Sequence, residues 1–466
     1  MFIYDRQQRE ALDQLVQDLN EQRIGRRVFL QRAMALGLTA SAAASVLAAC
    51  GTPSTTGGGT GTPATVTSVD VLNVWSGEEQ QSFDAVVTPF ESQSKITVKI
   101  EATRDLDAVL TSRLRGGNPP DIAVLPNPGK MQQLASQGKL IPLDSFLDMN
   151  KVKSDYASTW INLGSYNGRL YALFYKAANK GTIWYNPTQL QAIGGTIPKT
   201  WDDLIKLSDM IASKGKYPWS MGVESGSASG WPAADWVDEI FLLQSGPDLY
   251  DQWVNHKIPW THSSVKQAFQ TFAQIITGKH YINGAPQSIL ATNFQDASYA
   301  PFKNPPEAYL YYLGDFTAGF ITAQFKNAQP GKDFNFFPFP TINAQYQGAV
   351  TGGADVIVAL KDNNGVRELV KYLETAQAQE IWVKRGGFTS PSKAVSLSSY
   401  PNDVARASAQ MLTSATIFRF GADDLMPPAM ETAYWKAMLD FIKDPTKLDS
   451  ILSSLEATAQ QAYASS

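Results

Sequence analysis

The sequence is poor in the residues that most often carry chemistry. Cys50 is the only cysteine, which excludes a disulfide within the chain. The three histidines, His256, His262 and His280, have none of the spacings at which histidines usually bind a metal ion. We therefore expect no metal site, no cofactor and no histidine-based catalysis.

An excess of basic charge is also missing. The chain has 39 Lys and Arg residues against 43 Asp and Glu residues, a formal net charge of −4, and its body contains no long basic block. Proteins that bind nucleic acid neutralise phosphates with clustered basic side chains. The composition therefore argues against nucleic acid as a partner.

The motifs of common hydrolases are absent or incomplete. Ser-x-x-Lys occurs at 263–266 and 390–393, but neither Ser-Asp-Asn nor Lys-Thr-Gly accompanies it, and Gly-x-Ser-x-Gly does not occur. The glycine run at 57–61 has no strand before it and no Gly-Lys-Ser/Thr after it, so it is not a phosphate-binding loop. A glycoside hydrolase stays open, because it needs only two carboxylates across a sugar site, for instance Glu78 and Glu224.

Residues 1–49 have the pattern of an export signal. A polar and charged stretch, 1–24, precedes Arg26-Arg27-Val28-Phe29-Leu30, which resembles the twin-arginine export motif. The small and apolar run at 33–49 that follows is interrupted by polar residues, so it is too weakly hydrophobic for a permanent membrane span. The leader is unusually long, which leaves both the twin-arginine and the general secretion route open.

Leu47-Ala48-Ala49-Cys50 resembles the bacterial lipobox, in which the cysteine is lipidated and the peptide bond before it is cut. The alternative is a buried structural cysteine. Residues 50–68 are almost entirely Gly, Thr, Ser, Pro and Ala, a composition typical of a flexible linker. The sequence thus predicts a folded body that begins near Val69, held by a lipid on Cys50 at the outer face of the cytoplasmic membrane.

In the body, short apolar runs alternate with helical patterns. Expected strands at 69–75, 96–101 and 121–125 are separated by expected helices at 80–93 and 105–114, a pattern that predicts parallel βαβ units in an α/β fold. The chain is also too long for one ordinary core, so we expect two lobes. Further expected elements are a tight hairpin at Asn167-Gly168, strands at 181–185, 333–339 and 355–360, and helices at 200–214, 231–245, 263–277, 365–385, 428–443 and 448–463.

Several segments of the body resemble the carbohydrate-binding class of ABC-importer binding proteins. They are 74–79 (VWSGEE), 117–123 (GNPPDIA), 168–172 (GRLYA), 184–187 (WYNP), 198–204 (PKTWDDL) and 352–355 (GGAD). Two others, 125–129 (LPNPG) and 418–427 (FRFGADDLMP), look most like the alpha-glucoside-type binding proteins.

This resemblance implies a type II periplasmic-binding-protein fold, with two α/β lobes, a cleft and a hinge crossed more than once. We place lobe one at 69–178 plus 345–383 and lobe two at 179–344 plus 384–466. The implied function is a monomeric, non-enzymatic receptor. It captures a sugar or oligosaccharide by lobe closure and passes it to the transmembrane subunits of an ABC permease. The same scaffold could take a non-sugar solute instead, such as a polyamine, a metal ion or phosphate.

A sugar receptor needs flat aromatic surfaces for the C–H faces of the ring and polar side chains for its hydroxyl groups. Candidates in such a cleft are residues that follow strands or lie in loops. In lobe one the candidates are Trp75, Glu78, Glu79, Asn127, Gly353 and Asp355. In lobe two they are Glu224, Trp231, Gly314, Asp315, Arg385, Phe388, Phe418, Arg419, Phe420 and Asp423.

Several candidates have a structural alternative. Trp75 could pack in the core, Asn127 could cap the helix after it, and Gly353 could serve only the backbone. Arg385 could belong to an ordinary helix end, and Arg419 could pair with Asp423 or Asp424. The sequence leaves these alternatives open.

Overall fold

The computed structural model describes residues 66–464, and the chain from Val66 onward forms one compact unit. The predicted export signal, Cys50 and nearly all of the predicted linker lie outside the described residues. Within residues 66–464, no helix combines the length and the apolar character needed to cross a membrane.

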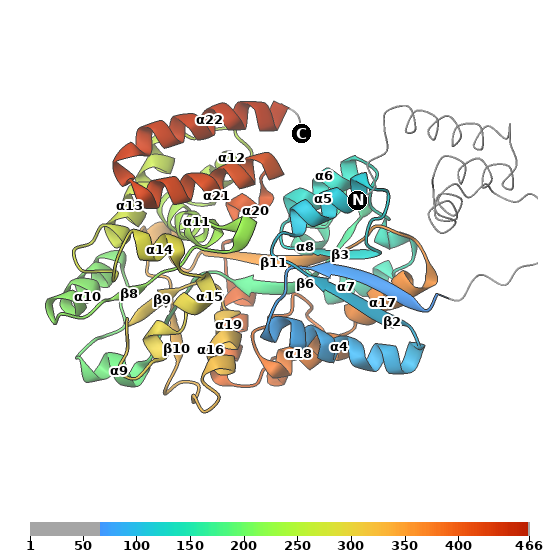
Figure 1. Cartoon of the computed structure of the whole chain (residues 1–466), viewed down its shortest axis with the longest axis horizontal. Coiled ribbons are helices and arrows are strands. Elements are labelled where there is room, and N and C mark those ends of the chain that lie inside the picture. The colour runs from blue at the N-terminus through green and yellow to red at the C-terminus, as the bar shows by residue number, and fades with distance from the viewer. Residues whose placement is uncertain (1–65, 465–466) are drawn as a thin grey trace, which may run out of the picture. The chain divides into compact units, whose positions relative to one another are not determined.

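The body contains two larger β-sheets, each with its own helices and its own hydrophobic core, joined in the middle by long strands (Figure 1). The first sheet has the order β12-β11-β3-β1-β2, with β6 paired to β11. Its strands are β1 (Ser68–Asn73), β2 (Thr97–Ala102), β3 (Ile122–Leu125), β6 (Ala172–Asn179), β11 (Val350–Ala359) and β12 (Phe418–Phe420). Around it lie α4 (Glu78–Ser94), α5 (Leu106–Arg115), α6 (Pro128–Ser136), α7 (Met149–Asp155), α8 (Ser158–Leu163), α17 (Asn364–Glu374), α18 (Ala376–Arg385) and α19 (Asp403–Ser414).

The second sheet is smaller and has the order β10-β7-β9-β8. Its strands are β7 (Thr182–Tyr185), β8 (Trp219–Ser220), β9 (Leu310–Tyr312) and β10 (Asn335–Pro338). Helices form most of this half: α9 (Pro187–Ala192), α10 (Trp201–Ser213), α11 (Trp231–Ser245), α12 (Pro247–Val254), α13 (Ser263–Ile276), α14 (Gln287–Ala291), α15 (Phe294–Ala297), α16 (Thr317–Gln324), α20 (Ala422–Leu425), α21 (Pro428–Lys443) and α22 (Leu448–Ala464).

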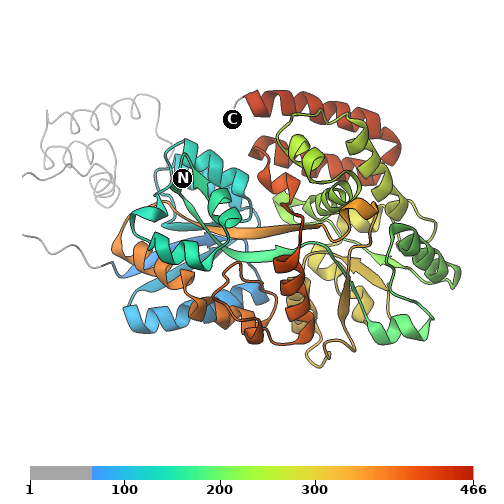
Figure 2. The ribbon, with the colours of Figure 1, turned by 180° about the vertical axis from the view of Figure 1, so that it is seen from behind.

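The alternating pattern at the start of the body correctly predicts its parallel strands. Val71 of β1 is opposite Ile100 of β2 and Ile122 of β3, and both pairings are parallel. The sheet as a whole is nevertheless mixed, because β11 runs antiparallel to β3 and to β6. Figure 2 shows from behind how β6 and β11 run side by side through the middle of the body.

The polypeptide passes from one core to the other at three neighbouring places. β6 leads through Lys180-Gly181 into β7, β10 leads back to β11, and β12 leads through Gly421 into α20. These crossings are bonded to each other, since Lys180 N donates to Thr351 O at 3.0 Å and Gly421 N donates to Gly352 O at 2.8 Å. The hinge implied by the resemblance is therefore a bundle of strands rather than a loose linker.

Two predicted details differ from the structure. The expected helix at 365–385 is two helices, because Thr375 ends α17 in extended backbone and caps α18 with a side chain that accepts from Ala378 N. The predicted division gave 384–466 to lobe two, but Phe388, Val395 and Tyr400 pack in the core of the first sheet. Residues from Ala422 to Ala459 do pack in the second core.

Candidate functional site

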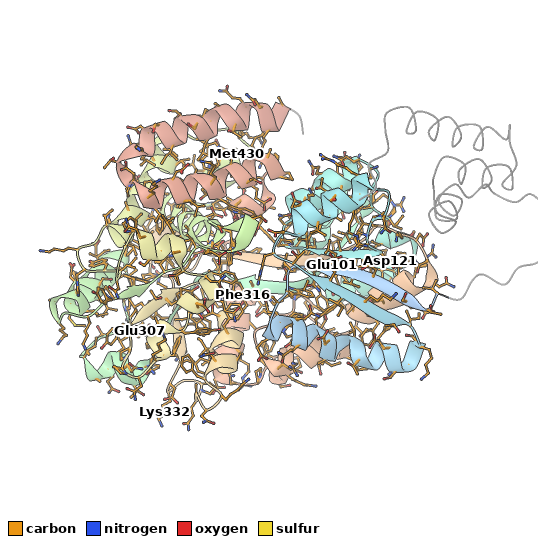
Figure 3. The ribbon with its side chains drawn as sticks, in the orientation of Figure 1. Glu101, Asp121, Glu307, Phe316, Lys332 and Met430 are labelled. Carbon is orange, nitrogen blue, oxygen red and sulfur yellow. The ribbon has the colours of Figure 1, made fainter. Side chains whose placement is uncertain are left out.

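A cavity of about 680 Å³ lies between the two halves, beside the bundle of crossing strands. The first half contributes residues from α4, α5, α6, β6 and β11 and from the segments that follow β1, β2 and β3. The second half contributes the 225–231 segment, residues from α15, α16, α20 and α21, and Phe316. Phe316 is labelled in Figure 3, where it lies between the halves. We call this space the main cavity.

Charged side chains of the first half form a connected group at one side of the main cavity. Glu79, in the first turn of α4, accepts from Lys176 Nζ at 2.9 Å and from Arg104 Nη2 at 3.4 Å. Asp355 of β11 accepts from the indole N–H of Trp75 at 2.6 Å. Burial alone would lower the pKa of Lys176, but the charges of Glu79 and Asp355 outweigh it, and the pKa is raised. These carboxylates therefore favour the charged form of Lys176 in the cavity wall.

Aromatic rings of the second half face this charged group. Trp231 packs against Phe294 with ring centroids 5.1 Å apart and against Phe316 at 6.2 Å. The cations of the first half lie over these rings, with Lys176 Nζ 5.0 Å from the Phe316 centroid and the Arg104 guanidinium 5.1 Å from that of Phe294. Cation–π attraction thus contributes to holding the two halves together.

The backbone before α11 explains the position of Trp231. Gly230 has φ of 110°, and a Cβ at this position would collide with the backbone of Trp435 on α21. Only glycine combines this conformation with so close an approach. The loop that ends at Gly230 therefore passes directly against α21 and delivers Trp231 to the cavity at the first position of α11.

Lys180 is the charged residue at the crossing between β6 and β7. Its Nζ donates to Asp235 at 2.6 Å and to Asp424 at 3.1 Å, and it lies 5.8 Å from the ring centroid of Trp231. Burial would lower the pKa of Lys180, but these carboxylates raise it well above its ordinary value. Gly353 makes room for this lysine, since a Cβ there would lie 3.0 Å from Lys180 Cε.

Buried acids surround Lys180. Asp235, Asp238 and Asp423 lie close enough to share a metal ion, with candidate ligand atoms within 4.8 Å of one another. Protein donors already engage all three, because Asp235 bonds to Lys180 and Asp238 accepts from Ala422 N at 2.7 Å and Tyr434 Oη at 3.1 Å. Asp423 accepts from the indole N–H of Trp435 at 2.7 Å. These contacts favour a structural network with its own internal cation.

Burial raises the pKa of Asp235, Asp238 and Asp424. It raises the pKa of Asp235 to about 7, even though Lys180 opposes the shift, and it raises the pKa of Asp238 and Asp424 well above the ordinary range. Nearby Glu239 accepts from the backbone and the hydroxyl of Thr351, yet burial raises its pKa to about 7 as well.

At the other side of the main cavity, α21 meets the end of β3. Asn127 Nδ2 donates to Glu431 Oε1 at 2.6 Å, and the side-chain oxygen of Asn127, Oδ1, is buried without a partner. Asn127 precedes α6 but its side chain makes no capping bond, so the alternative of an ordinary cap is wrong. Lys130, in the first turn of α6, pairs with Asp107 of α5 at 2.7 Å.

The halves also touch at the rim. Ser227 N donates to Asp105 Oδ1 at 3.3 Å, and its hydroxyl donates to Arg104 O at 3.4 Å. A second cavity of about 340 Å³ shares Glu79, Phe316 and Phe320 with the main one and is lined by residues of α4, α16 and α18. Across it, Lys326 pairs with Glu78 at 3.6 Å.

The structure brings eight of the predicted site residues to these cavities. Six line the main cavity: Trp75, Glu79, Asn127, Trp231, Gly353 and Asp355. Glu78 and Arg385 line the second cavity, where Arg385 Nε donates to Ser82 Oγ at 3.0 Å. The ring of Trp75 is packed between Phe83 and Trp382 in the first core, as its structural alternative predicts. Its N–H also reaches Asp355 at the wall of the main cavity.

Other predicted residues line neither cavity. Phe388 and Phe420 are core residues, 3% and 2% exposed, and Phe418 packs against Trp160 with centroids 5.5 Å apart. Arg419 pairs with Asp251, at 2.6 and 2.8 Å, and not with Asp423 or Asp424.

Of the four remaining candidates, Gly314 and Asp423 contact residues of the main cavity. Gly314 lets the ring of Phe316 fold back, because a Cβ at 314 would lie 2.6 Å from that ring. Asp423 accepts a hydrogen bond from the indole N–H of Trp435, which lines the main cavity. Two further candidates are held by bonds outside both cavities. Asp315 accepts from Thr389 and Ser408 at 2.6 and 3.0 Å, and Glu224 accepts from Gly226 N and Asn293 Nδ2, both at 2.8 Å.

Sequence reasoning missed most of the charged residues of the main cavity. Lys176 and Lys180 stand in or beside a strand whose residues are all buried, and no local pattern marks a lysine there as buried and paired over long range. Trp435 looks like one more apolar position of α21. The residues missed include Arg104, Asp107, Arg115, Lys130, Lys176, Lys180, Phe294, Phe316, Phe320, Asp424, Glu431 and Trp435.

Comparison with known proteins agrees with this architecture. The family model described as bacterial extracellular solute-binding protein matches residues 75–380. The osmoprotective compounds-binding protein GgtB of Synechocystis sp. is 34% identical over 80% of this chain and 88% of its own length. The alpha-glucosides-binding periplasmic protein AglE of Rhizobium meliloti is 31% identical over 81% of this chain and 84% of its own length.

Among solved structures, the bacterial solute receptor AcbH superposes with a TM-score of 0.76 at 20% identity, covering 85% of this chain and 99% of AcbH. The GacH receptor of Streptomyces glaucescens gives a TM-score of 0.70 at 16% identity, over 86% of this chain and 99% of GacH. At these identities the likeness shows the fold alone. The chain belongs to the bacterial extracellular solute-binding proteins. This confirms both the resemblance and the two-lobed α/β fold predicted from the sequence motifs.

Proposed function

We propose that this protein is the extracytoplasmic receptor of an ABC importer and that it captures a sugar or short oligosaccharide in the main cavity. The proposal depends on one observation, which is that the two halves supply different kinds of surface to that cavity. Trp231, Phe316 and Phe294 provide aromatic surface from one half, while Glu79, Arg104 and Asp355 provide hydrogen-bonding groups from the other. A polyhydroxylated ring needs both kinds of surface.

The relatives support a glucoside as the ligand class. AglE is named for binding alpha-glucosides and GgtB for osmoprotective compounds, and both align over most of this chain. The two segments that most resemble alpha-glucoside-type proteins also meet in space, because Gly129 lies so close to the backbone of Met426 that a Cβ would collide with it. We therefore propose an alpha-glucoside.

Ligand capture follows from the position of the cavity. A ligand that contacts both halves stabilises the closed arrangement over an open one. The permease can then distinguish the ligand-bound receptor from the empty one by its shape. We propose that capture involves no chemical change. The carboxylates considered for hydrolysis, Glu78 and Glu224, do not share a cavity, since Glu78 lines the second cavity and Glu224 lines neither.

A thermal-shift and calorimetry screen tests this function. The body from residue 66 would be exposed to alpha-glucosides, other mono- and oligosaccharides, polyamines, phosphate and divalent metal ions, and each stabilising sugar would be analysed for products. We expect stabilisation by a sugar and its full recovery. Stabilisation by a non-sugar alone, or steady release of a product, would overturn the proposal.

We also propose that the protein works as a monomer on the outer face of the cytoplasmic membrane, anchored by a lipid on Cys50. The lipobox-like 47–50 segment supports the anchor. Expression of the full chain and of Cys50→Ser, with radiolabelled palmitate and membrane fractionation, tests it. We expect label and membrane association only in the unsubstituted chain, and a labelled Cys50→Ser chain would contradict the anchor.

A further inference from the structure

One face of α11 is bonded to each of the three crossings between the halves. Asp235, Asp238 and Glu239 share this face because they lie three and four positions apart in the helix, and each is at most 1% exposed. Each acid accepts from a different crossing. The donors, in the order of the acids, are Lys180 Nζ at 2.6 Å, Ala422 N at 2.7 Å and Thr351 N at 2.8 Å.

Glycines on the crossings leave room for these bonds. A Cβ at Gly181 would lie 2.9 Å from Glu239 Oε1, and a Cβ at Gly421 would lie 3.2 Å from Lys180 Nζ. Side chains at these positions would push Glu239 and Lys180 away from the crossings. The acids of α11 are thus packed directly against the hinge, so a change in its angle changes their surroundings.

The acids outnumber the cation that pairs with them. Within residues 66–464, Lys180 is the cation that forms ion pairs in this group, with Asp235 at 2.6 Å and with Asp424 at 3.1 Å. The buried acids of the group without an ion pair in this range are Asp238, Glu239 and Asp423. Burying an unpaired charge costs so much free energy that a carboxyl group binds a proton instead. The group therefore holds protons near neutral pH.

Two oxygens of the group have room for an exchangeable proton. Oδ2 of Asp235 and Oε1 of Glu239 are buried and have no hydrogen-bond partner among the described residues. Burial raises the pKa of both side chains to about 7. Other titratable side chains that face this group of acids are Lys180, Asp238, Asp423, Asp424, Glu431, Tyr250, Tyr311, Tyr312 and Tyr434. Burial raises the pKa of these four tyrosines well above its ordinary value, so they stay neutral.

The group also borders the main cavity. Lys180 and Asp424 line this cavity, and so does Trp231, the first residue of α11. Water enters the cavity when the halves separate, and a ligand expels that water when the halves close on it. Loss of water favours the neutral form of a carboxyl group. Closure therefore favours a proton on the acids beside Lys180.

We infer that the acids of α11 link ligand capture to proton binding. The group takes up a proton from the solvent as the halves close on a ligand, so sugar affinity falls as pH rises through neutrality. Asp235, Asp238 and Glu239 act as positioning residues, since they fasten the helix of Trp231 to the crossings and do not line the main cavity. By reciprocity, a proton that binds more tightly to the closed arrangement also stabilises it, with or without a ligand. The effect on affinity rests on the proposed function, whereas the effect on the empty chain does not.

The distance between the halves tests the inference without a ligand. The body from residue 66 contains no cysteine, so Gln137→Cys after α6 and Ala457→Cys on α22, both at exposed positions, can carry a pair of dyes. We expect energy transfer between the dyes to rise from about pH 8 to about pH 6. EDTA in every buffer excludes a bound metal ion as the cause. Asp235→Asn should remove the response to pH.

Two further variants complete this test. Glu239→Gln keeps an oxygen that can accept from Thr351 but cannot ionise, and it should weaken the response to pH. Glu374→Gln is the matched control, because Glu374 is a buried acid of the first half, 6% exposed, that pairs with Lys151 outside both cavities. Glu374→Gln should keep the full response.

Calorimetry measures the proton itself. Maltose, trehalose and sucrose are titrated into the body in phosphate and in Tris buffer, which release different heats when they give up a proton. The difference gives the number of protons taken up on binding. We expect uptake of about half a proton, equivalent to about a tenfold loss of affinity between about pH 6 and about pH 8. Asp235→Asn should abolish the uptake.

A distance between the halves that does not change with pH would overturn the inference. So would a response that survives both Asp235→Asn and Glu239→Gln, or a release of protons on binding. If none of the sugars binds while the distance still responds to pH through Asp235, the proposed function fails and the proton link stands. If a sugar binds with equal affinity across this pH range, the link fails and the receptor function stands.

Discussion

Asn127 and Glu431 are 304 positions apart in the chain, yet the amide of Asn127 donates a 2.6 Å hydrogen bond to the carboxyl group of Glu431. The bond joins the end of β3 to α21, so it connects the two halves directly at the wall of the main cavity. Burial, together with Asp424 and Asp423, raises the pKa of Glu431 well above its ordinary value. The contact thus joins an amide to a carboxyl group that is poorly able to ionise.

Asn127→Asp should therefore separate the halves. A second carboxyl group would stand against Glu431 in a place that disfavours negative charge, and we expect sugar affinity to fall about tenfold or more. Asn127→Ala should cost less, about 1–3 kcal/mol for the lost bond and the unpaired partner. Calorimetry and thermal unfolding measure both. A gain in affinity for Asn127→Asp would contradict a role of this bond in holding the two halves together around the ligand.

Buried Glu239 predicts a pH dependence of stability. Its pKa is about 7 in the folded chain, compared with an ordinary value of 4.5, because burial penalises the ionised form. Between these values the folded state holds more protons than the unfolded state. Glu239 therefore lowers the free energy of unfolding as pH rises from about 4.5 to 7, by up to ~1.4 kcal/mol per pH unit.

Glu239→Gln should flatten this part of the profile, because glutamine stays neutral at every pH. Urea unfolding at a series of pH values measures the slope for both proteins. Glu307→Gln replaces an exposed glutamate, labelled in Figure 3, and is the matched control. An unchanged slope in Glu239→Gln would show that the carboxyl group ionises normally in the folded chain.

Trp231 and Trp236 offer a matched pair on one helix. Trp231 is partly exposed and lines the main cavity, whereas Trp236 is 2% exposed in the second core. Trp231→Ala should weaken sugar binding by about 1 kcal/mol or more with a modest change in stability. Trp236→Ala should instead lower the free energy of unfolding by about 3–5 kcal/mol. Unchanged affinity with lost stability in Trp231→Ala would assign this ring to packing.

Arg104 should control how long the ligand stays bound. Its guanidinium reaches Glu79 and the face of Phe294, and its carbonyl accepts from Ser227, so it contacts both halves at the rim. Arg104→Ala should raise the dissociation rate about tenfold, with a smaller effect on association. Stopped-flow fluorescence measures both rates. Arg169→Ala, which breaks an exposed pair with Asp144 far from the cavities, should leave both rates unchanged.

The sequence correctly predicted those elements of the fold that depend on interactions between residues close together in the chain. The hairpin at Asn167-Gly168 forms as expected, with φ of 48° and 76° at the two turn residues. Thr200 caps α10 by accepting from Asp203 N, and the predicted bounds of α11 and α21 match the structure. These features depend on neighbours in sequence, so a single sequence contains the signal.

The main cavity is formed by contacts between residues that are far apart in the chain. The sequence alone therefore predicted fewer of the residues that line it. Trp231 and Asn127 were predicted from the resemblance and from their places after strands or loops. Arg419 was a reasonable candidate for the same reasons, but its partner Asp251 lies 168 positions away and no local pattern marks the pair. Lys176 and Lys180 look like surface residues until their carboxylates are known.

The place of β11 has a consequence for biosynthesis. This strand stands between β3 and β12 in the first sheet and also pairs with β6, so the amino-terminal half lacks a central strand until the ribosome has passed residue 359. The edge strand β12 follows only at 418–420. The early βαβ units must therefore wait for nearly the entire polypeptide before their sheet closes, and a nascent chain that stalls earlier exposes open strand edges to aggregation.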